Sequence, residues 1–259
     1  MQRRTHAWGA RNQVEFDAGK EYFKILHPVS GEGEDFKLVG TLMDCKLTMK
    51  PCIDQLLGQI RPKIKAIVRL QFLYSTEALL GQYKAHVWSI KEYSSGAILL
   101  AAPTQLQRLD QVQGTFLKDI GITDTTASIN FNFAPPSLRR AIGLLGFLHK
   151  RALGKCHPLV SDALPFAAVE LCSNYHNKAL HPPTEHVDYQ SRLFNRSLYG
   201  YIFIYNRLPQ ALIDRSSVKS FQATLTHLAK MDAMMGVEQW RGSFQSLENL
   251  HEMFRFRGN

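Results

Sequence analysis

Residues 36–69 read FKLVGTLMDCKLTMKPCIDQLLGQIRPKIKAIVR and contain two elements with different hydrophobic periods. Over residues 36–43 apolar residues alternate with others, and Gly40 among them is typical of a strand that another group approaches closely. From Ile53 to Ile67 an Ile or Leu recurs every three or four positions, which predicts an amphipathic helix. Pro62 inside that helix predicts a kink or a break. We therefore expect a strand that leads into a long, bent helix.

Positive charge is concentrated in the same stretch. Residues 37–69 hold seven Lys or Arg and two Asp, a balance of +5 out of +9 for the whole chain. Arg61, Lys65 and Arg69 follow one another at four-residue spacing beside the apolar face, and we call these three residues the basic ridge. Such a row of cations favours contact with the phosphates of a polyanion. The alternative is a solvated row that only keeps the helix soluble.

Before this stretch, residues 21–27 predict a strand and residues 28–35 an acidic, Gly-rich loop. Together with residues 36–43 they predict a β-hairpin with a long connection. If Gly40 lies where backbone or a ligand strand approaches, Gly40→Val should do more harm than Gly31→Val in the loop.

After the long helix, a second helix is expected from Ser75 or Thr76 to Glu92. Its inward residues are expected to be Leu79, Leu80, Tyr83, Val87 and Ile90. Pro103 is expected to begin another helix, residues 121–136 to form a loop, and Ser137 to cap the helix that follows it.

Several short pieces of the sequence resemble one known family. The run from Phe36 to Gly40, then Met43-Asp44 and Lys46-Leu47-Thr48, resembles the primer grip and first thumb helix of reverse transcriptases, in particular those of non-LTR (LINE-type) retrotransposons. The pieces that flank it in the family's order are Trp8-Gly9 with Asn12, Phe16, Lys20 and Glu21; Tyr83-Lys84-Ala85 with Tyr93; Leu109 to Gln113; and Tyr205 to Pro209 with Ser217, Val218 and Phe221. The resemblance therefore covers about residues 8 to 225.

The resemblance implies an α+β fold in three parts. Residues 1–47 would be a palm remnant with the primer-grip hairpin, and residues 48–180 a predominantly α-helical thumb with its connected helices. Residues 181–259 would be a C-terminal helical region after the Pro-rich linker His181–His186.

The resemblance also implies the site residues. The residues expected to contact nucleic acid are Phe36, Lys37, Leu38, Val39, Gly40, Lys46, Lys50, Arg61, Lys65 and Arg69. Lys20 corresponds to a lysine near the incoming triphosphate that could act as general acid toward the leaving pyrophosphate. The alternative for Lys20 is a solvated lysine at a strand edge.

Catalysis by this chain alone is not expected. Polymerase chemistry needs carboxylates that hold two Mg²⁺ ions, and the sequence contains no Asp-Asp pair. The palm and fingers that carry them would precede Met1. We therefore predict no metal site and no bound cofactor in this chain, although the full polymerase would need Mg²⁺. The expected partners are an RNA–DNA hybrid or primer-template and the missing palm and fingers.

Composition limits the class of protein. The four cysteines form no C-x-x-C motif, which favours free thiols in a reducing compartment over a disulfide framework or a zinc site. No apolar run has the length of a secretory or membrane-spanning segment, so we expect an intracellular protein, nuclear or cytoplasmic, without a membrane partner. Two other functions remain open: a stand-alone nucleic-acid-binding helical module, and a non-functional relic of a decayed element.

Overall fold

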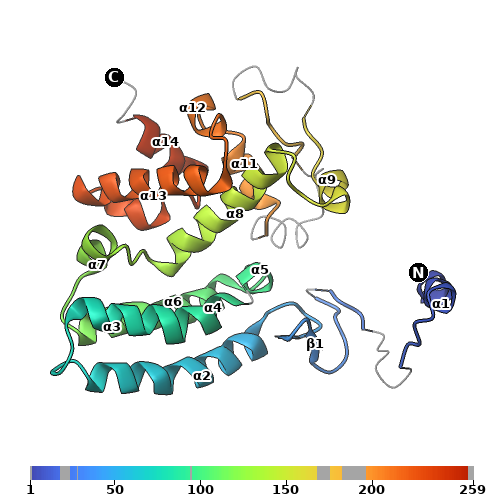
Figure 1. Ribbon diagram of the computed structural model, residues 1–259, viewed down its shortest axis with the longest axis horizontal. Coiled ribbons are helices and arrows are strands. Elements are labelled where there is room, and N and C mark those ends of the chain that lie inside the picture. Colours follow the sequence, from blue (N-terminus) through green and yellow to red (C-terminus); the bar gives the residue numbers. More distant parts are fainter. Residues whose placement is uncertain are drawn as a thin grey trace.

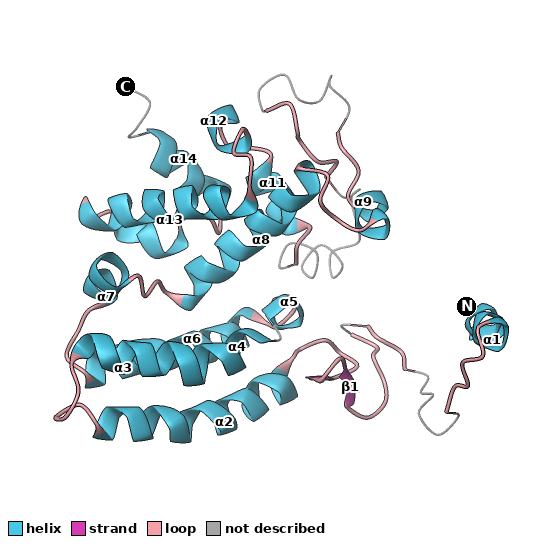
Figure 2. Ribbon diagram, viewed as in Figure 1, coloured by secondary structure: helices cyan, strands magenta, loops and turns pink. Residues whose placement is uncertain are grey.

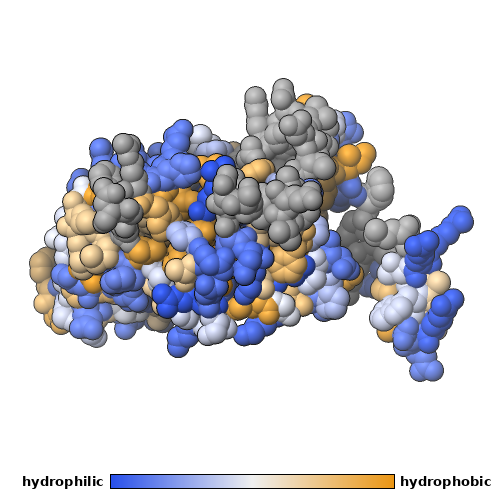
Figure 3. Space-filling view, turned by 90° about the horizontal axis from the view of Figure 1, so that it is seen from above, coloured by the Kyte–Doolittle hydropathy of each residue, from blue (hydrophilic) through white to orange (hydrophobic). Residues whose placement is uncertain are grey.

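The chain is mostly helical, with one small two-stranded antiparallel sheet (Figures 1 and 2). The computed structural model describes residues 2–17, 24–27, 29–93, 95–167, 176–182 and 197–255. This composition agrees with the predicted α+β class. Helix α1 (Gln2–Arg11) lies away from the rest of the molecule in Figures 1 and 3. None of the helices in these ranges combines the length and the apolar character needed to cross a membrane.

The sheet is a tight hairpin inside the stretch that was predicted as one strand. Strand β1 (Phe36–Leu38) pairs with β2 (Thr41–Met43), with Leu38 opposite Thr41. Val39 and Gly40 connect them with φ angles of 48° and 80°. Positive φ at both central residues marks a two-residue turn that reverses the chain. The prediction of a single strand over 36–43 is therefore wrong, because Gly40 lies in the turn between two short strands rather than in the interior of one.

Of the earlier strand predicted over 21–27, the structure describes residues 24–27, and these form a single bridge. Residues 21–23 lie outside the described residues, and Ile25 forms an isolated antiparallel bridge with Glu32. The His27 amide donates to the Cys45 carbonyl at 3.0 Å, so this segment lies beside the chain that follows the hairpin.

Helix α2 (Lys50–Arg69) is one uninterrupted helix of 20 residues. Its buried face carries the predicted Ile and Leu residues together with Cys52. Pro62 lies on the exposed side, as does Gly58, whose carbonyl loses its helical partner. Water can reach that carbonyl, and the helix continues through the proline. Of the two outcomes predicted at Pro62, a kink or a break, the break is excluded, and the helix is continuous as expected.

The helices after α2 complete an N-terminal core. The predicted helix over 75–92 is present as three consecutive segments: α3 (Thr76–Tyr83), the π-helix η2 (Lys84–Trp88) and α4 (Ser89–Tyr93). The Ser75 hydroxyl accepts from the Ala78 amide at 3.3 Å and caps α3, as predicted. The short α5 (Ser95–Ile98) follows, and then α6 (Pro103–Asp119), which begins at Pro103 as predicted.

A second core is built around two long crossing helices, α8 and α13 (Figure 1). The C-terminal elements are α7 (Asp124–Phe131), α8 (Pro136–Ala152), α9 (Pro158–Ala163), α11 (Gly200–Tyr205), α12 (Gln210–Ile213), α13 (Val218–Met234), the 3₁₀-helix η4 (Glu238–Gly242) and α14 (Leu247–Arg255). Helix α7 falls where a loop was predicted: its β-branched and polar residues have low helix propensity, but it is capped by Thr123 and packs on α6 and α13. Pro135, not Ser137, precedes the first residue of α8.

The two cores meet between α7 and α8. Ala127 and Phe133 belong to the N-terminal core, and Ala134 and Leu138 to the C-terminal one. Helix α8 therefore packs with the elements of the C-terminal core, although the predicted division grouped it with the thumb. The division at residue 181 itself stays a prediction.

Candidate nucleic-acid interface

The hairpin presents its turn to solvent. Val39 is 84% exposed, and Lys37 and Leu38 are exposed too, whereas Met43 on the other strand is buried in the N-terminal core. The hairpin is therefore anchored mainly through β2, and the end of β1 projects from the core together with the turn. Phe36 is half-buried and packs against the same core.

Two glycines near the hairpin differ in how closely other atoms approach them, and the closer approach is at Gly31, not at Gly40 as the sequence suggested. Gly40 needs its positive φ, but a Cβ there would lie 3.6 Å from the Tyr93 ring, an ordinary contact. A Cβ on Gly31 would overlap the Cys45 carbonyl and lie 2.6 Å from the His27 carbonyl oxygen. Backbone atoms cannot move aside as a flexible side chain can. Both substitutions are therefore expected to be costly, Gly31→Val because its side chain would overlap backbone and Gly40→Val because of its positive φ. Gly31 is the glycine that backbone approaches closely, and the relative harm of the two substitutions stays a prediction.

Asp44 joins the hairpin to α2. Its carboxylate accepts from the backbone amides of Thr48 at 3.0 Å and Met49 at 2.8 Å, just before the helix begins. An acceptor at this place satisfies amides that helical bonding leaves free, and its charge suits the helix dipole. Asp44 thus holds the hairpin at the amino end of α2, a positioning role that the sequence analysis did not assign.

A groove of about 330 Å³ lies between the hairpin, α2 and α4. It is lined by Gly40, Thr41 and Leu42, by Cys52, Gln55, Leu56 and Gln59, and by Ser89, Ile90 and Tyr93. Gln55, Gln59 and Lys63 follow at four-residue spacing, so one row of α2 continues the groove wall toward the carboxyl end. Lys63 is exposed at the end of that row. Lys63 is not among the predicted contacts, although its four-residue spacing from Gln59 is evident in the sequence.

The basic ridge lies on the exposed side of α2. Arg61, Lys65 and Arg69 are all exposed, and within the described part of the chain none of them forms an ion pair. Together with Lys63 they place four cations and no acidic residue between positions 61 and 69. An anion can approach them without displacing a carboxylate. This half of α2 is therefore the most accessible row of positive charge in the predicted site.

Two other predicted contacts, Lys46 and Lys50, lie between the hairpin and the basic ridge in the chain. Lys46 is exposed, and Lys50 pairs with Asp54 at 3.5 Å, a carboxylate that Arg108 on α6 also binds at 2.8 Å. That hydrogen bond from Arg108 lowers the pKa of Asp54. A helix of 20 residues is about 30 Å long, so the predicted residues from the hairpin to Arg69 form a line rather than a pocket. Lys20 lies outside the described residues.

A second cationic cluster lies where α4, α6 and α8 meet, with Lys91 buried at its centre, Asp110 and two arginines half-buried, and Glu92 exposed at its edge. Asp110 on α6 accepts from both terminal nitrogens of Arg140, at 2.8 and 2.5 Å, and lies 3.9 Å from the Lys91 ammonium. Arg139 pairs with Glu92 and stacks on Trp88, its guanidinium carbon 3.5 Å from the ring centroid. We call Lys91, Glu92, Asp110, Arg139 and Arg140 the buried charge cluster. Burial lowers the pKa of Lys91 to about 7, although Asp110 opposes the shift.

The π-helix explains why Lys91 points inward. A π-turn takes up one extra residue, which rotates the following residues by about 100° around the axis. Ile90, predicted to face inward, is only half-buried, whereas Lys91 is 2% exposed. The helix therefore buries a lysine where its sequence period predicts an isoleucine.

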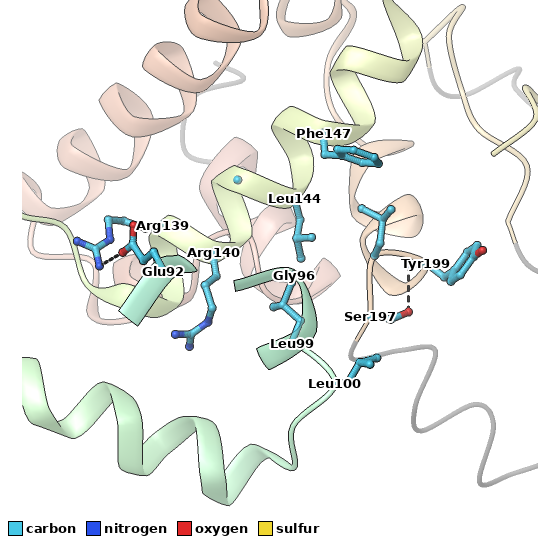
Figure 4. A pocket seen from close by; sticks show the side chains of 12 residues that line it. Glu92, Gly96, Leu99, Leu100, Arg139, Arg140, Leu144, Phe147, Ser197 and Tyr199 are labelled. Atoms are coloured by element: carbon cyan, nitrogen blue, oxygen red, sulfur yellow. Dashed lines mark hydrogen bonds and ion pairs between the residues drawn. The ribbon is translucent and has the colours of Figure 1, made fainter. Parts of the chain in front are cut away.

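Next to this cluster is a cavity of about 510 Å³, shown in Figure 4. Leu144 and Phe147 on α8 and Leu99 and Leu100 after α5 form its apolar part, and Glu92, Arg139 and Arg140 lie at one end. The carboxylates of Glu92 and Asp110 already neutralise the two arginines. The described lining of the cavity therefore offers mostly carbon surface and no unpaired cation for an anionic ligand.

Among the described residues no group of three or more His, Cys, Asp or Glu is placed to hold a metal ion. Comparisons of the chain with protein-family models, with curated proteins and with solved structures find no match. The functional assignment therefore depends on the geometry of α2 and the hairpin.

Proposed function

We propose that this chain is the part of a non-LTR retrotransposon reverse transcriptase that follows the catalytic palm. In this proposal the hairpin and the exposed face of α2 hold the primer-template. The observation that carries the proposal is the second half of α2, where Arg61, Lys65 and Arg69 form an exposed row on the helix that follows an anchored hairpin. Phosphate contacts from such a row supply affinity that does not depend on sequence.

Two further features support a palm remnant at the amino end. Helix α1 lies away from both cores, and the Trp8 side chain on it is exposed although tryptophan is a strongly buried type. The exposed turn at Val39 and Gly40 also offers an apolar surface beside the groove. Both surfaces would be covered by a palm domain or by the primer. Any Mg²⁺ would be held by that palm.

The experiment is a salt titration of binding to duplex, RNA–DNA hybrid and single-stranded oligonucleotides. Changing Arg61, Lys65 and Arg69 together to Gln should weaken binding to every duplex or hybrid sequence by a similar factor. It should also flatten the slope of log K against log salt by up to about 3 units, through loss of counterion release.

The matched control changes Lys118, Lys150 and Lys219 to Gln. These three lysines are exposed on α6, α8 and α13, so the control removes the same charge from other surfaces. It should leave the salt slope close to that of the unchanged protein. If both triple variants flatten the slope equally, net charge and not α2 determines binding, and the proposal fails.

A further inference from the structure

The turn between α2 and α3 exposes three consecutive large apolar residues. Phe72 is 89% exposed, Leu73 79% and Tyr74 51%. They follow Arg69, the last residue of α2 and of the basic ridge, by only three to five positions. Exposed side chains of this size in a cluster commonly mark a binding surface.

Backbone hydrogen bonds fix this turn. The Leu70 amide donates to the Ile67 carbonyl at 3.0 Å, and the amides of Leu73 and Tyr74 donate to the Leu70 carbonyl at 2.9 and 3.1 Å. Leu70 itself packs against the N-terminal core. The next segment begins at once with Ser75, which caps α3. The outward direction of Phe72 and Tyr74 is thus set by the fold, and little ordering is needed before they bind a partner.

From this geometry we propose that Phe72 and Tyr74 stack on unpaired bases at a junction between double and single strand. The inference rests on the proposed function and names its substrate class. The basic ridge would hold the phosphates of the duplex. The nucleic-acid strand would then reach Phe72 and Tyr74 at the turn where the ridge ends. Aromatic side chains beside cations are the usual means of binding single strands without sequence preference.

A membrane surface is the other partner that aromatic residues and cations can recognise. Cations that assist insertion of an apolar tip gather around it at one depth, near the charged headgroups. Here they extend from Arg69 back to Arg61, about 12 Å along the helix axis. A linear array that leads away from the tip fits a linear polyanion better.

The test uses the full chain with two probes: a blunt duplex, and the same duplex with a single-stranded extension. Phe72→Ala with Tyr74→Ala should weaken binding to the extended duplex by at least about fivefold per stacked base. Binding to the blunt duplex, and the salt slope on both, should not change. A fluorescent base analogue at the first unpaired position should report stacking on the unchanged protein and lose that signal with the double variant.

Two controls make the result specific. Leu73→Ala removes an apolar side chain from the same turn without removing a ring, and should leave binding unchanged. The exchange Phe72→Tyr with Tyr74→Phe keeps both rings and should preserve binding. The proposal is overturned if the double alanine variant binds the extended duplex as the unchanged protein does, or if Leu73→Ala costs as much.

The outcome for the turn is separable from that for α2. If the ridge variant leaves binding to both probes unchanged, the proposed function fails whatever the turn variants do. If only the ridge variant weakens binding, the stacking proposal fails and the proposed function stands. Sedimentation with vesicles of phosphatidylserine and phosphatidylcholine provides the last arm: binding that depends on Phe72 and Leu73, without preference for the extended duplex, overturns the proposal in favour of a membrane.

Discussion

On the exposed face of α2, Arg61, Lys65 and Arg69 project into solvent, and the described residues offer them no carboxylate within ion-pair distance. Where α4, α6 and α8 meet, Lys91, Arg139 and Arg140 are largely buried and share two carboxylates, Glu92 and Asp110. Both groups are sets of Lys and Arg on helices, but their surroundings are opposite. In water, two charges interact weakly, whereas in the interior each charge needs a partner.

This difference assigns the two groups to different tasks. The exposed cations contribute little to the stability of the fold and are available to a ligand, because surface charges cost little to leave unpaired. The buried ones join the two cores and cannot leave their carboxylates without a large loss of free energy. The three predictions below test this contrast, beginning with the largest expected effect.

Asp110→Ala should lower the free energy of unfolding by about 3–5 kcal/mol, because it leaves Lys91 and Arg140 buried without their shared carboxylate. Urea denaturation measures the change. The control is Asp119→Ala, which removes an exposed aspartate from the end of the same helix and should stay within about 0.5 kcal/mol of the unchanged protein. Similar losses in the two variants would mean that the buried charge cluster does not hold the cores together.

The two groups also differ in how far the sequence could predict them. The exposure of Arg61, Lys65 and Arg69 follows from the period of α2 alone, because neighbours three and four positions apart decide which side is apolar. The burial of Lys91 depends on a π-turn and on Asp110 and Arg140, which are distant in the chain and reach it only through the packing of α6 and α8. No local pattern carries that information.

The same limit explains the hairpin and Gly31. Alternation across residues 36–43 correctly indicated extended backbone, but it could not show that Val39 would adopt a positive φ beside Gly40. The contact of Gly31 with Cys45 joins segments that no repeat or spacing links. Sequence predicted the elements with long, regular periods, and missed those that tertiary contacts impose.

Lys91→Met should change how stability depends on pH. In the folded protein the pKa of Lys91 is about 7, far below its ordinary value of about 10.4. Between these two values the unfolded chain binds one more proton than the folded chain. The free energy of unfolding should therefore rise with pH above 7, by at most about 1.4 kcal/mol per unit from this group. Burial of the charged form costs most below pH 7, where Lys91 is protonated in both states.

The measurement is the difference in unfolding free energy between the unchanged protein and Lys91→Met from pH 6 to about 9. Burial lowers the pKa values of His149 and His176 as well, but both variants retain these groups, so the difference isolates Lys91. The raised pKa values of Tyr83 and Tyr205 act in the opposite direction above pH 10, but both proteins retain these groups too, and they cancel in the same difference. Lys118→Met, on the surface of α6, is the control. Parallel curves for Lys91→Met and the unchanged protein would show that Asp110 keeps Lys91 charged throughout.

The smallest effect on stability is expected within α2 itself, where Lys50→Gln and Lys65→Gln remove one cation each from the same helix. Lys50 pairs with Asp54, whereas Lys65 has no ion pair among the described residues. Both variants should stay within about 0.5 kcal/mol of the unchanged protein, because an exposed pair between residues four apart stabilises a helix only slightly. Their effects on binding should differ. Lys65→Gln should flatten the slope of log K against log salt by about 0.9 on duplex DNA, the value for one phosphate contact.

Lys50→Gln should flatten that slope less, because Lys50 must exchange Asp54 for a phosphate and its positive charge is already partly balanced in the free protein. Asp54 does not lose its only partner in that exchange, since Arg108 binds it at 2.8 Å. The difference between the two lysines is therefore expected to be partial rather than complete. Equal slopes for the two variants would contradict the idea that pairing in the free chain decides which cations serve a ligand. If neither Lys50→Gln nor Lys65→Gln changes the slope, the alternative holds: α2 is a solvated helix whose charges only keep it soluble.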